Sequence, residues 1–319
     1  MELYYHRSVL GNFGDDLNAW LWDELLPGWR DWDPGRVLVG VGTLLSSTII
    51  ERELVRRRRY LVVGAGVGYG DGRLPDVSDR SVWDVRALRG PHSARSLGLP
   101  SEIGMLDPAI MIAGLPGFRA IPATGRPVFV PHESTVERHD WSSACADAGL
   151  DFVSPRGDAR QVIARIAGAS TVLAESMHAA IMADAFRVPW IPVRIGHRFL
   201  DSKWRDWASS LDLHLGRIPR LFPIEDRGFA LPRLTLAAMR VCSRRHSRSA
   251  AASRATAPEI RPFRPGVEER LQVRVEAAHI AGALRRHLRR VPLLSEDARL
   301  TGQMGRFRNV LETIRNDYG

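Results

Sequence analysis

Residues 171–196, with the sequence TVLAESMHAAIMADAFRVPWIPVRIG, predict a strand, a turn, a helix and a second strand. Apolar residues lead into a turn at Glu175 and Ser176, and an apolar stripe marks the helix that follows. Pro189 ends this helix, and the apolar residues after it begin the next strand. This order of elements is typical of an α/β fold with a parallel sheet.

His178 lies in the first turn of the predicted helix, because Ser176 is placed as its N-cap. A helix N-terminus that follows a parallel strand offers free N–H groups and the positive end of a dipole, so it favours an anion. We expect the pKa of His178 to be low in the empty site and to rise when a phosphate or carboxylate binds. His178 is therefore a candidate proton donor. The alternative is a histidine that only satisfies a helix end.

The composition is ordinary for a globular protein of 319 residues, of which 45% are hydrophobic, and it allows one large or two medium domains. The chain has no long apolar run and does not begin with the apolar stretch of a signal peptide, so we expect a cytoplasmic protein. Its two cysteines, Cys145 and Cys242, lie far apart and in no Cys/His cluster. This argues against a disulfide framework and a structural zinc site.

The net charge of +9 is concentrated in residues 240–290, which contain thirteen Arg, four Glu and no Asp or Lys. A basic segment of this kind suits an anionic membrane surface or another anionic partner. Nucleic acid is the competing partner, but the segment has a single aromatic residue among its arginines, Phe263, and no recognition motif. We therefore expect no nucleic acid, and either peripheral contact with the inner membrane face through residues 240–290 or, as an equal alternative, a solvated linker.

Four short apolar runs predict the strands of a first α/β unit, at residues 3–5, 37–41, 60–63 and 82–88. The tight loop GNFGDD, residues 11–16, follows the first strand, and a helix is expected from about residue 16 to 26 with Asp15 or Asp16 as its cap. A second helix is expected through Leu45, Ile49 and Leu54. Ser93 is expected to cap a short helix that ends near residue 97.

The glycine-rich stretch GAGVGYG, residues 64–70, is a weak dinucleotide signal. Its third glycine falls one residue too early for GxGxxG, and no capped helix follows it. Glycines that let the backbone approach a ligand at strand ends explain the stretch better.

A second α/β unit follows residues 114–126, with strands predicted at 128–130 and 151–153, helices at 141–148 and after Asp158, and then the opening stretch. In such sheets, ligands bind outside the carboxyl ends of the strands. By this rule six polar residues are expected to face one cleft between the two units: Asn12, Arg89, His132, Arg156, His178 and Arg194.

Three stretches resemble the polysaccharide pyruvyl transferase family, especially its exopolysaccharide ketal-forming branch. They are GNFGDDLNAW (11–20), LRGPHSARSLGLP followed by LDPAIMI (88–112), and ESMHAAIMADAFRVPWIPV (175–193). The resemblance covers roughly residues 1–215. It implies a GT-B-like pair of Rossmann-type, doubly wound domains followed by C-terminal helices, and transfer of pyruvate from phosphoenolpyruvate to a sugar as a cyclic ketal.

The family's common Ser-Arg-Leu-His motif falls on residues 175–178, ESMH, where the histidine matches and Ser176 replaces the arginine. Arg89, Arg156 or Arg194 are therefore expected to compensate. Phosphoenolpyruvate carries a phosphate and a carboxylate, which suit arginine forks and helix-end N–H groups.

The resemblance divides the chain into an acceptor-side domain at residues 1–122, a donor-side domain at 123–230, and a basic linker with C-terminal helices at 231–319. His178 is the expected general acid, and Asp15 or Asp16 orients or deprotonates acceptor hydroxyls, although an N-cap role is an equal alternative. The remaining expected site residues are Arg89, Ser176, Arg156, Arg194, His132 and Lys203 for the donor, and Asn12 and Gly14 for the acceptor. No metal-ligand spacing appears, and phosphoenolpyruvate is expected as a co-substrate without a further cofactor.

The C-terminal third predicts helices at residues 204–211, 228–241, 267–288 and 297–314, with linker composition at 243–258. We expect the last helix to pack back on the domains. Two other functions remain open: a nucleotide-sugar glycosyltransferase of the GT-B type, and a non-catalytic sugar- or nucleotide-binding module of the same fold.

Overall fold

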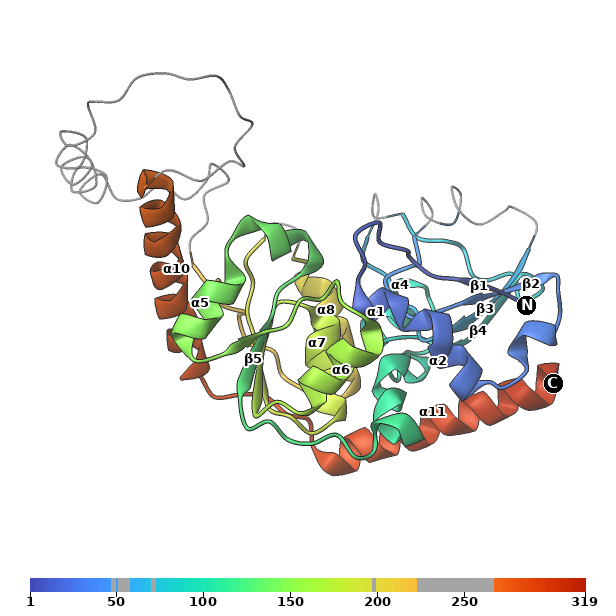
Figure 1. Ribbon diagram of the computed structural model, residues 1–319. Helices are drawn as coiled ribbons and strands as arrows, with labels where there is room; N and C mark the ends of the chain where they lie inside the picture. The colour runs from blue at the N-terminus through green and yellow to red at the C-terminus, as the bar shows by residue number, and fades with distance from the viewer. Residues whose placement is uncertain (47–49, 51–57, 70–72, 197–198, 223–266) are drawn as a thin grey trace, which may run out of the picture.

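The computed structural model describes residues 1–46, 50, 58–69, 73–196, 199–222 and 267–319. Two parallel four-stranded sheets, each packed against helices, form an α/β protein (Figure 1). The expected helix through Ile49 and Leu54, the expected helix at 228–241 and the linker at 243–258 lie outside the described residues.

The first sheet has the order β1-β2-β3-β4, with strands β1 (Glu2–Tyr4), β2 (Arg36–Val39), β3 (Arg59–Val63) and β4 (Trp83–Ala87). The helical elements described around it are α1 (Phe13–Asp16), α2 (Asn18–Leu25), η1 (Trp29–Asp31), α4 (Pro91–Ser96), η2 (Ser101–Ile103), η3 (Pro108–Gly114) and η4 (Pro116–Phe118). All three strand pairings are parallel, as the sequence predicts.

The second sheet has the order β6-β5-β7-β8, with strands β5 (Pro127–Val130), β6 (Asp151–Phe152), β7 (Thr171–Ala174) and β8 (Trp190–Pro192). Its helical elements are η5 (Glu133–Arg138), α5 (Trp141–Ala148), α6 (Ala159–Ala167), α7 (Met177–Ala185) and α8 (Asp201–Ser210). The strand order reverses between β5 and β7, as expected for a doubly wound sheet. In the first sheet the described strands follow chain order, and each one pairs with the strand before it.

Successive side chains of a strand point to opposite faces of its sheet, so the core is divided into layers. Val128 and Val172 face a large central cluster, whereas Phe129 and Leu173 face a second cluster on the opposite side of their sheet. The central cluster also contains Leu61 from the first sheet, so the two α/β units share one core. This shared core fixes how the two sheets face each other.

Two long helices complete the chain, α10 (Val267–Leu288) and α11 (Asp297–Tyr318). The last helix packs back on both units, as predicted: Phe307 is buried in the central cluster, and Tyr318 donates a hydrogen bond of 2.5 Å from its hydroxyl to Asp84 of β4. Figure 1 shows α11 running along the outside of the first unit, while α10 lies beside α5. Among the described helices, none is both long enough and apolar enough to cross a membrane.

Two predicted helix caps are corrected by the structure. Asn12, rather than Asp15 or Asp16, is the N-cap of α1, because its Oδ1 accepts a hydrogen bond from the Gly14 amide. Ser93 lies inside α4, which begins at Pro91, where proline's missing N–H makes no difference. The predicted N-cap of α6, Asp158, is confirmed by its bond from the Gln161 amide.

Candidate active site

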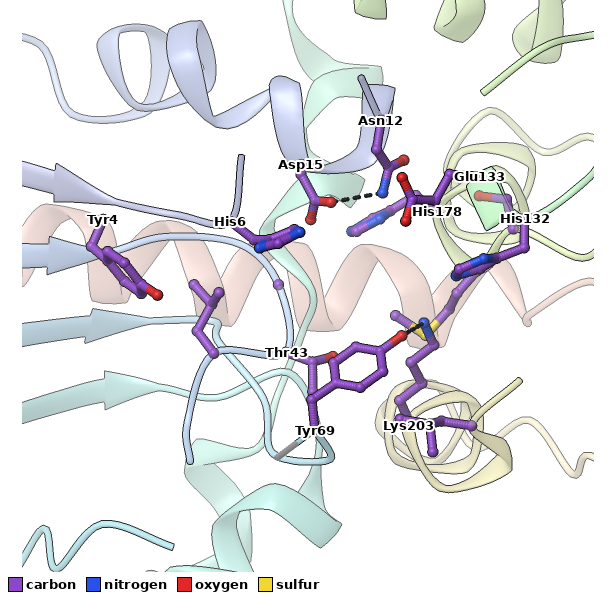
Figure 2. A pocket seen from close by; sticks show the side chains of 15 residues that line it. Tyr4, His6, Asn12, Asp15, Thr43, Tyr69, His132, Glu133, His178 and Lys203 are labelled. Atoms are coloured by element: carbon purple, nitrogen blue, oxygen red, sulfur yellow. Dashed lines mark hydrogen bonds between the residues drawn. The ribbon is translucent and has the colours of Figure 1, made fainter. Parts of the chain in front are cut away.

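A cavity of about 590 Å³ lies between the two sheets, at the carboxyl ends of their strands (Figure 2). Its walls come from the loops after β1, β2, β3, β5 and β7 and from the start of α8, so both units contribute. The lining residues are Tyr4, His6, Asn12, Asp15, Gly42, Thr43, Leu44, Tyr69, His132, Glu133, Ser176, Met177, His178, Leu200 and Lys203. On the second sheet, the cavity sits where the strand order reverses, which is where ligands bind in open parallel sheets.

Glu175 fixes the loops that form the second-sheet wall. The carboxylate of this buried residue accepts hydrogen bonds from the amides of His132, Ile195 and Gly196, each at 2.9 Å, and from the Thr135 hydroxyl at 2.5 Å. These donors follow β5 and β8, while Glu175 itself follows β7. The carboxylate therefore ties three neighbouring strand ends together directly before α7.

The N-terminus of α7 opens towards the cavity. Ser176 is at the N-cap position but makes no side-chain capping bond, so the predicted capping bond is absent. Both Ser176 and Met177 line the cavity. The first amides of a helix have no partner within the helix, and together with the dipole they favour an anion at this position.

His178 is in the first turn of α7, as predicted, and only 8% of its surface is exposed. Burial lowers its pKa to about 3, with Lys203 and Arg89 acting in the same direction. The lowered pKa agrees with the expectation, although burial, and not the helix end, is the main cause. In the empty site at neutral pH the imidazole is therefore uncharged.

Gly14 packs directly against the imidazole of His178. A Cβ atom at Gly14 would lie 2.1 Å from Nδ1 of His178 and 2.4 Å from its Cγ, far inside van der Waals contact. Gly14 does not line the cavity, and its observed contact is with the histidine. Glycine is thus required here because the ring occupies the space of a side chain.

Asp15 lines the cavity from the first unit, whereas Asp16 does not. Asp15 Oδ2 accepts a hydrogen bond of 2.7 Å from Asn12, and burial raises the pKa of Asp15 to about 6. Asp16 accepts a bond of 3.0 Å from the Asn12 amide, which stabilises the start of α1. Of these two carboxylates, Asp15 is therefore the one available to a ligand.

Lys203 and His132 place nitrogen donors on the second-unit side of the cavity. The Lys203 ammonium, on a side chain that is largely buried, donates a hydrogen bond of 2.9 Å to the Tyr69 hydroxyl across the cavity (Figure 2). Nδ1 of His132 accepts from the Ser134 amide at 3.3 Å. The proton of a neutral His132 ring is therefore on Nε2.

The three arginines expected to face this cleft do not line it. Arg89 is fully buried and donates to Asp206 at 3.0 Å, to the Thr43 hydroxyl at 2.7 Å and to a backbone carbonyl. Arg156 pairs with Glu137 at 2.5 Å and donates to the Glu133 carbonyl at 2.9 Å, so it braces the cavity wall from behind. Arg194 lines a separate surface groove beside α8. These three residues therefore do not converge on the cavity as predicted: Arg89 and Arg156 bond residues of its wall and pair with Asp206 and Glu137, and Arg194 lies in the separate groove.

Several cavity residues escaped the sequence analysis, namely Tyr4, His6, Thr43, Tyr69 and Glu133. Tyr4 ends strand β1, and His6, Thr43 and Tyr69 follow strands of the first sheet, so the strand-end rule would have found these four had it been applied to that sheet as fully as to the second. Among the described residues, no group of three or more His, Cys, Asp or Glu side chains is arranged to hold a metal ion.

Comparison with known proteins gives two findings. The family model described as polysaccharide pyruvyl transferase matches residues 22–197. The chain is also 39% identical, over 324 aligned positions that cover all of both chains, to the succinoglycan biosynthesis protein ExoV of Rhizobium meliloti (strain 1021). The matched segment includes β2 to β8 and the histidine at the start of α7. The chain therefore belongs to the polysaccharide pyruvyl transferase family.

Proposed function

We propose that this protein transfers pyruvate from phosphoenolpyruvate to two hydroxyls of one sugar in an exopolysaccharide, or in its lipid-linked precursor, as a cyclic ketal. The observation that carries the proposal is the placement of a cation, a helix N-terminus, a buried histidine and a carboxylate around one cavity. An anionic donor and a hydroxyl acceptor need this combination.

The donor binds on the α7 side of the cavity. The open amides at the start of α7, the ammonium of Lys203 and Nε2–H of His132 are the groups that hold its phosphate and carboxylate. Ser176 adds a short hydroxyl at the same place. Because the arginines lie elsewhere, Lys203 replaces the arginine that the family motif has at position 176 as the main cationic contact.

His178 donates the proton that starts the reaction. The charges of the donor raise its pKa, and the imidazolium protonates the methylene carbon of phosphoenolpyruvate, giving a methyl group and an oxocarbenium-like centre. The first sugar hydroxyl adds to that centre and the phosphate leaves with its bridging oxygen. The second hydroxyl then closes the ring. Of the two hydroxyl protons, one restores His178 and the other leaves with phosphate.

Asp15 and Asn12 receive the acceptor on the first-unit side. An ionised Asp15 within the cavity accepts the proton of an attacking hydroxyl and passes it to the departing phosphate, and Asn12 holds the carboxylate in place. The similar protein from Rhizobium meliloti is named for succinoglycan biosynthesis, and we infer an acceptor of the same chemical class, an exopolysaccharide. The arrangement of an acceptor-side unit facing a donor-side unit across a cavity supports a GT-B-like pairing of Rossmann-type domains.

The basic residues 240–290 are the part of the chain that we propose contacts an anionic membrane. Thirteen arginines and four glutamates give this segment a net charge of +9, which is the whole net charge of the chain. Such a contact would place the cytoplasmic enzyme beside a lipid-linked acceptor.

The test is a direct assay with two readouts. Purified protein is incubated with phosphoenolpyruvate and an exopolysaccharide stripped of pyruvate, and phosphate release is measured together with the gain of pyruvate on the polymer. Thermal unfolding is measured in parallel with phosphoenolpyruvate and with a panel of nucleotide sugars. A rise in melting temperature with a nucleotide sugar, and none with phosphoenolpyruvate, would indicate a glycosyltransferase. A ligand that raises the melting temperature without turnover on any acceptor would indicate a binding module.

A further inference from the structure

Two buried polar atoms face each other at the base of the cavity without a hydrogen-bond partner: Nε2 of His178 and Oδ2 of Asp107. They are 3.9 Å apart. Asp107 is fully buried directly before η3, where its other oxygen, Oδ1, accepts a bond of 3.0 Å from the Ala109 amide. One oxygen of this carboxylate therefore has a structural role and the other does not.

The separation of these two atoms is informative. A bridging water needs two hydrogen bonds of about 2.8 Å at a roughly tetrahedral angle, which places its partners about 4.5 Å apart. At 3.9 Å the gap is too short for that water and only about 1 Å too long for a direct N–H···O bond. Leaving two buried polar atoms unpaired costs free energy, so the pair requires an explanation in function.

We propose that Asp107 is a positioning residue that holds Nε2–H of His178 and stabilises the imidazolium formed when the donor binds. The inference rests on the proposed function of His178. A carboxylate behind a histidine fixes its tautomer and its orientation, as in catalytic triads. With Nε2 held by Asp107, the proton for phosphoenolpyruvate leaves from Nδ1, the nitrogen beside Gly14.

The charges around the pair agree with this role. Lys203 and Arg89 act against protonation of His178 in the empty site. Burial is the largest cause that raises the pKa of Asp107 to about 6, and the charges of Asp206 and Asp15 add to it. The hydrogen bond from the Ala109 amide and the charge of Arg89 act in the opposite direction. The other ionisable side chains of the described cavity wall are Tyr4, His6, Tyr69, His132 and Glu133. A bound donor neutralises Lys203, and Arg89 is already paired with Asp206, so the Asp107 carboxylate then stabilises a proton on Nε2.

The main test is Asp107→Asn, which keeps the oxygen that bonds the Ala109 amide and removes the charge. We expect kcat to fall about 10²- to 10⁴-fold while KM for phosphoenolpyruvate changes less than about 3-fold. The high-pH limb of the kcat profile, which reports loss of the His178 proton, should move to lower pH by about one unit or more. The melting temperature at pH 8 should not fall, because a buried charge is removed. An unmoved limb would overturn the proposal.

Asp184→Asn is the matched control. Asp184 is also fully buried, but its oxygens are satisfied by Trp190 and Ser295. This variant should lower the melting temperature and leave the pH limb where it is. When Asp107→Asn is added to the His178→Gln variant, kcat should fall by less than about a further 3-fold. The two losses are not additive because the two residues act as a unit. Additive losses would refute the coupling while leaving the proposed function intact. Absence of pyruvyl transfer in the wild-type enzyme would instead refute the function.

A measurement on the wild-type protein does not depend on how the variants fold. Nitrogen NMR of His178, with phosphoenolpyruvate bound and no acceptor, reports each ring nitrogen during a pH titration. We expect Nε2 to stay protonated while Nδ1 titrates. The opposite assignment, with the proton retained on Nδ1, would overturn the proposal.

Discussion

His178 can act as an acid only if its neighbours leave room for the ring and its charge changes with the ligand. Burial keeps its pKa at about 3 in the empty cavity. His178→Gln should therefore leave the dissociation constant for phosphoenolpyruvate within about 3-fold and reduce kcat about 10²- to 10⁴-fold. His92→Gln, an exposed change on α4, serves as the control. Wild-type turnover in the His178 variant would remove this residue from the mechanism.

Gly14 sets the position of the same ring from the opposite unit. Gly14→Ala should displace the imidazole, because the new Cβ would lie 2.1 Å from Nδ1. We expect at least a 10²-fold loss of kcat, of the size seen for small misplacements of catalytic groups. Gly302→Ala, on an exposed part of α11 with nothing within 4 Å, should keep full activity. A fully active Gly14→Ala enzyme would show that the reaction does not require the His178 imidazole to lie against Gly14.

The raised pKa of Asp15 predicts two pH effects of known sign. Between an ordinary value of 3.8 and about 6, the folded protein holds a proton on Asp15 that the unfolded chain has lost, so stability from this group falls as pH rises. The melting temperature of the Asp15→Asn variant should therefore fall less than that of the wild-type protein between pH 4 and pH 8. The same variant should lose kcat/KM most above pH 6, where Asp15 is ionised. Asp23→Asn is the control. The hydrogen bond from Arg30 lowers the pKa of Asp23, so the stability that this group contributes is lost as pH falls and not as pH rises.

At the scale of elements, the active-site wall depends on one carboxylate that joins the ends of β5, β7 and β8. Glu175→Gln would direct an amide N–H₂ at groups that are themselves donors. We expect the free energy of unfolding to fall by about 2–4 kcal/mol, and donor affinity to fall with it, because the start of α7 loses its anchor. Glu137→Gln, whose carboxylate is mostly exposed in its pair with Arg156, should change stability by less than about 1 kcal/mol. Denaturant unfolding measures both.

At the scale of the whole molecule, one core and one helix join the two units. Phe307 of α11 is fully buried in the central cluster, and Gln303 of the same helix donates a bond of 2.7 Å to the Ser210 carbonyl. Phe307→Ala should reduce stability by about 3–5 kcal/mol and lower the midpoint of a single unfolding transition. The exposed Asn309→Ala is the control. Two separate transitions would contradict a shared core.

The basic segment belongs to the same scale, because it concerns how the whole enzyme meets a surface. Each arginine near an anionic leaflet contributes about 1 kcal/mol. We expect salt-sensitive binding to anionic vesicles, lost when Arg244, Arg245, Arg248 and Arg254 are all changed to Gln, with activity on a soluble acceptor retained. Co-sedimentation at low and high salt measures this. Binding that is indifferent to salt and to the four substitutions would reject the membrane contact.

The sequence by itself determined the elements whose signals are local. The bounds of α5 and α10, the turn at Glu175 and the place of His178 in the first turn of α7 all agree with the predictions. Each depends on periodicity, on proline or on capping chemistry within a few residues. The carboxyl ends of the strands could also be located, and three residues expected there line the cavity: Asn12, His132 and His178. Asp15, Ser176 and Lys203 also line it, and they were expected from the family resemblance.

Only the tertiary structure decided which polar groups pair with one another. Arg89 bonds Asp206 across 117 positions of the chain, and Asp107 reaches His178 across 71. No local pattern encodes such contacts, because whether a buried charge is paired depends on the packing of distant segments. The same reason explains why Arg89, which was expected in the cavity, forms a buried ion pair with Asp206. It also explains why Asp107, in the stretch that resembles the family, lies beside His178.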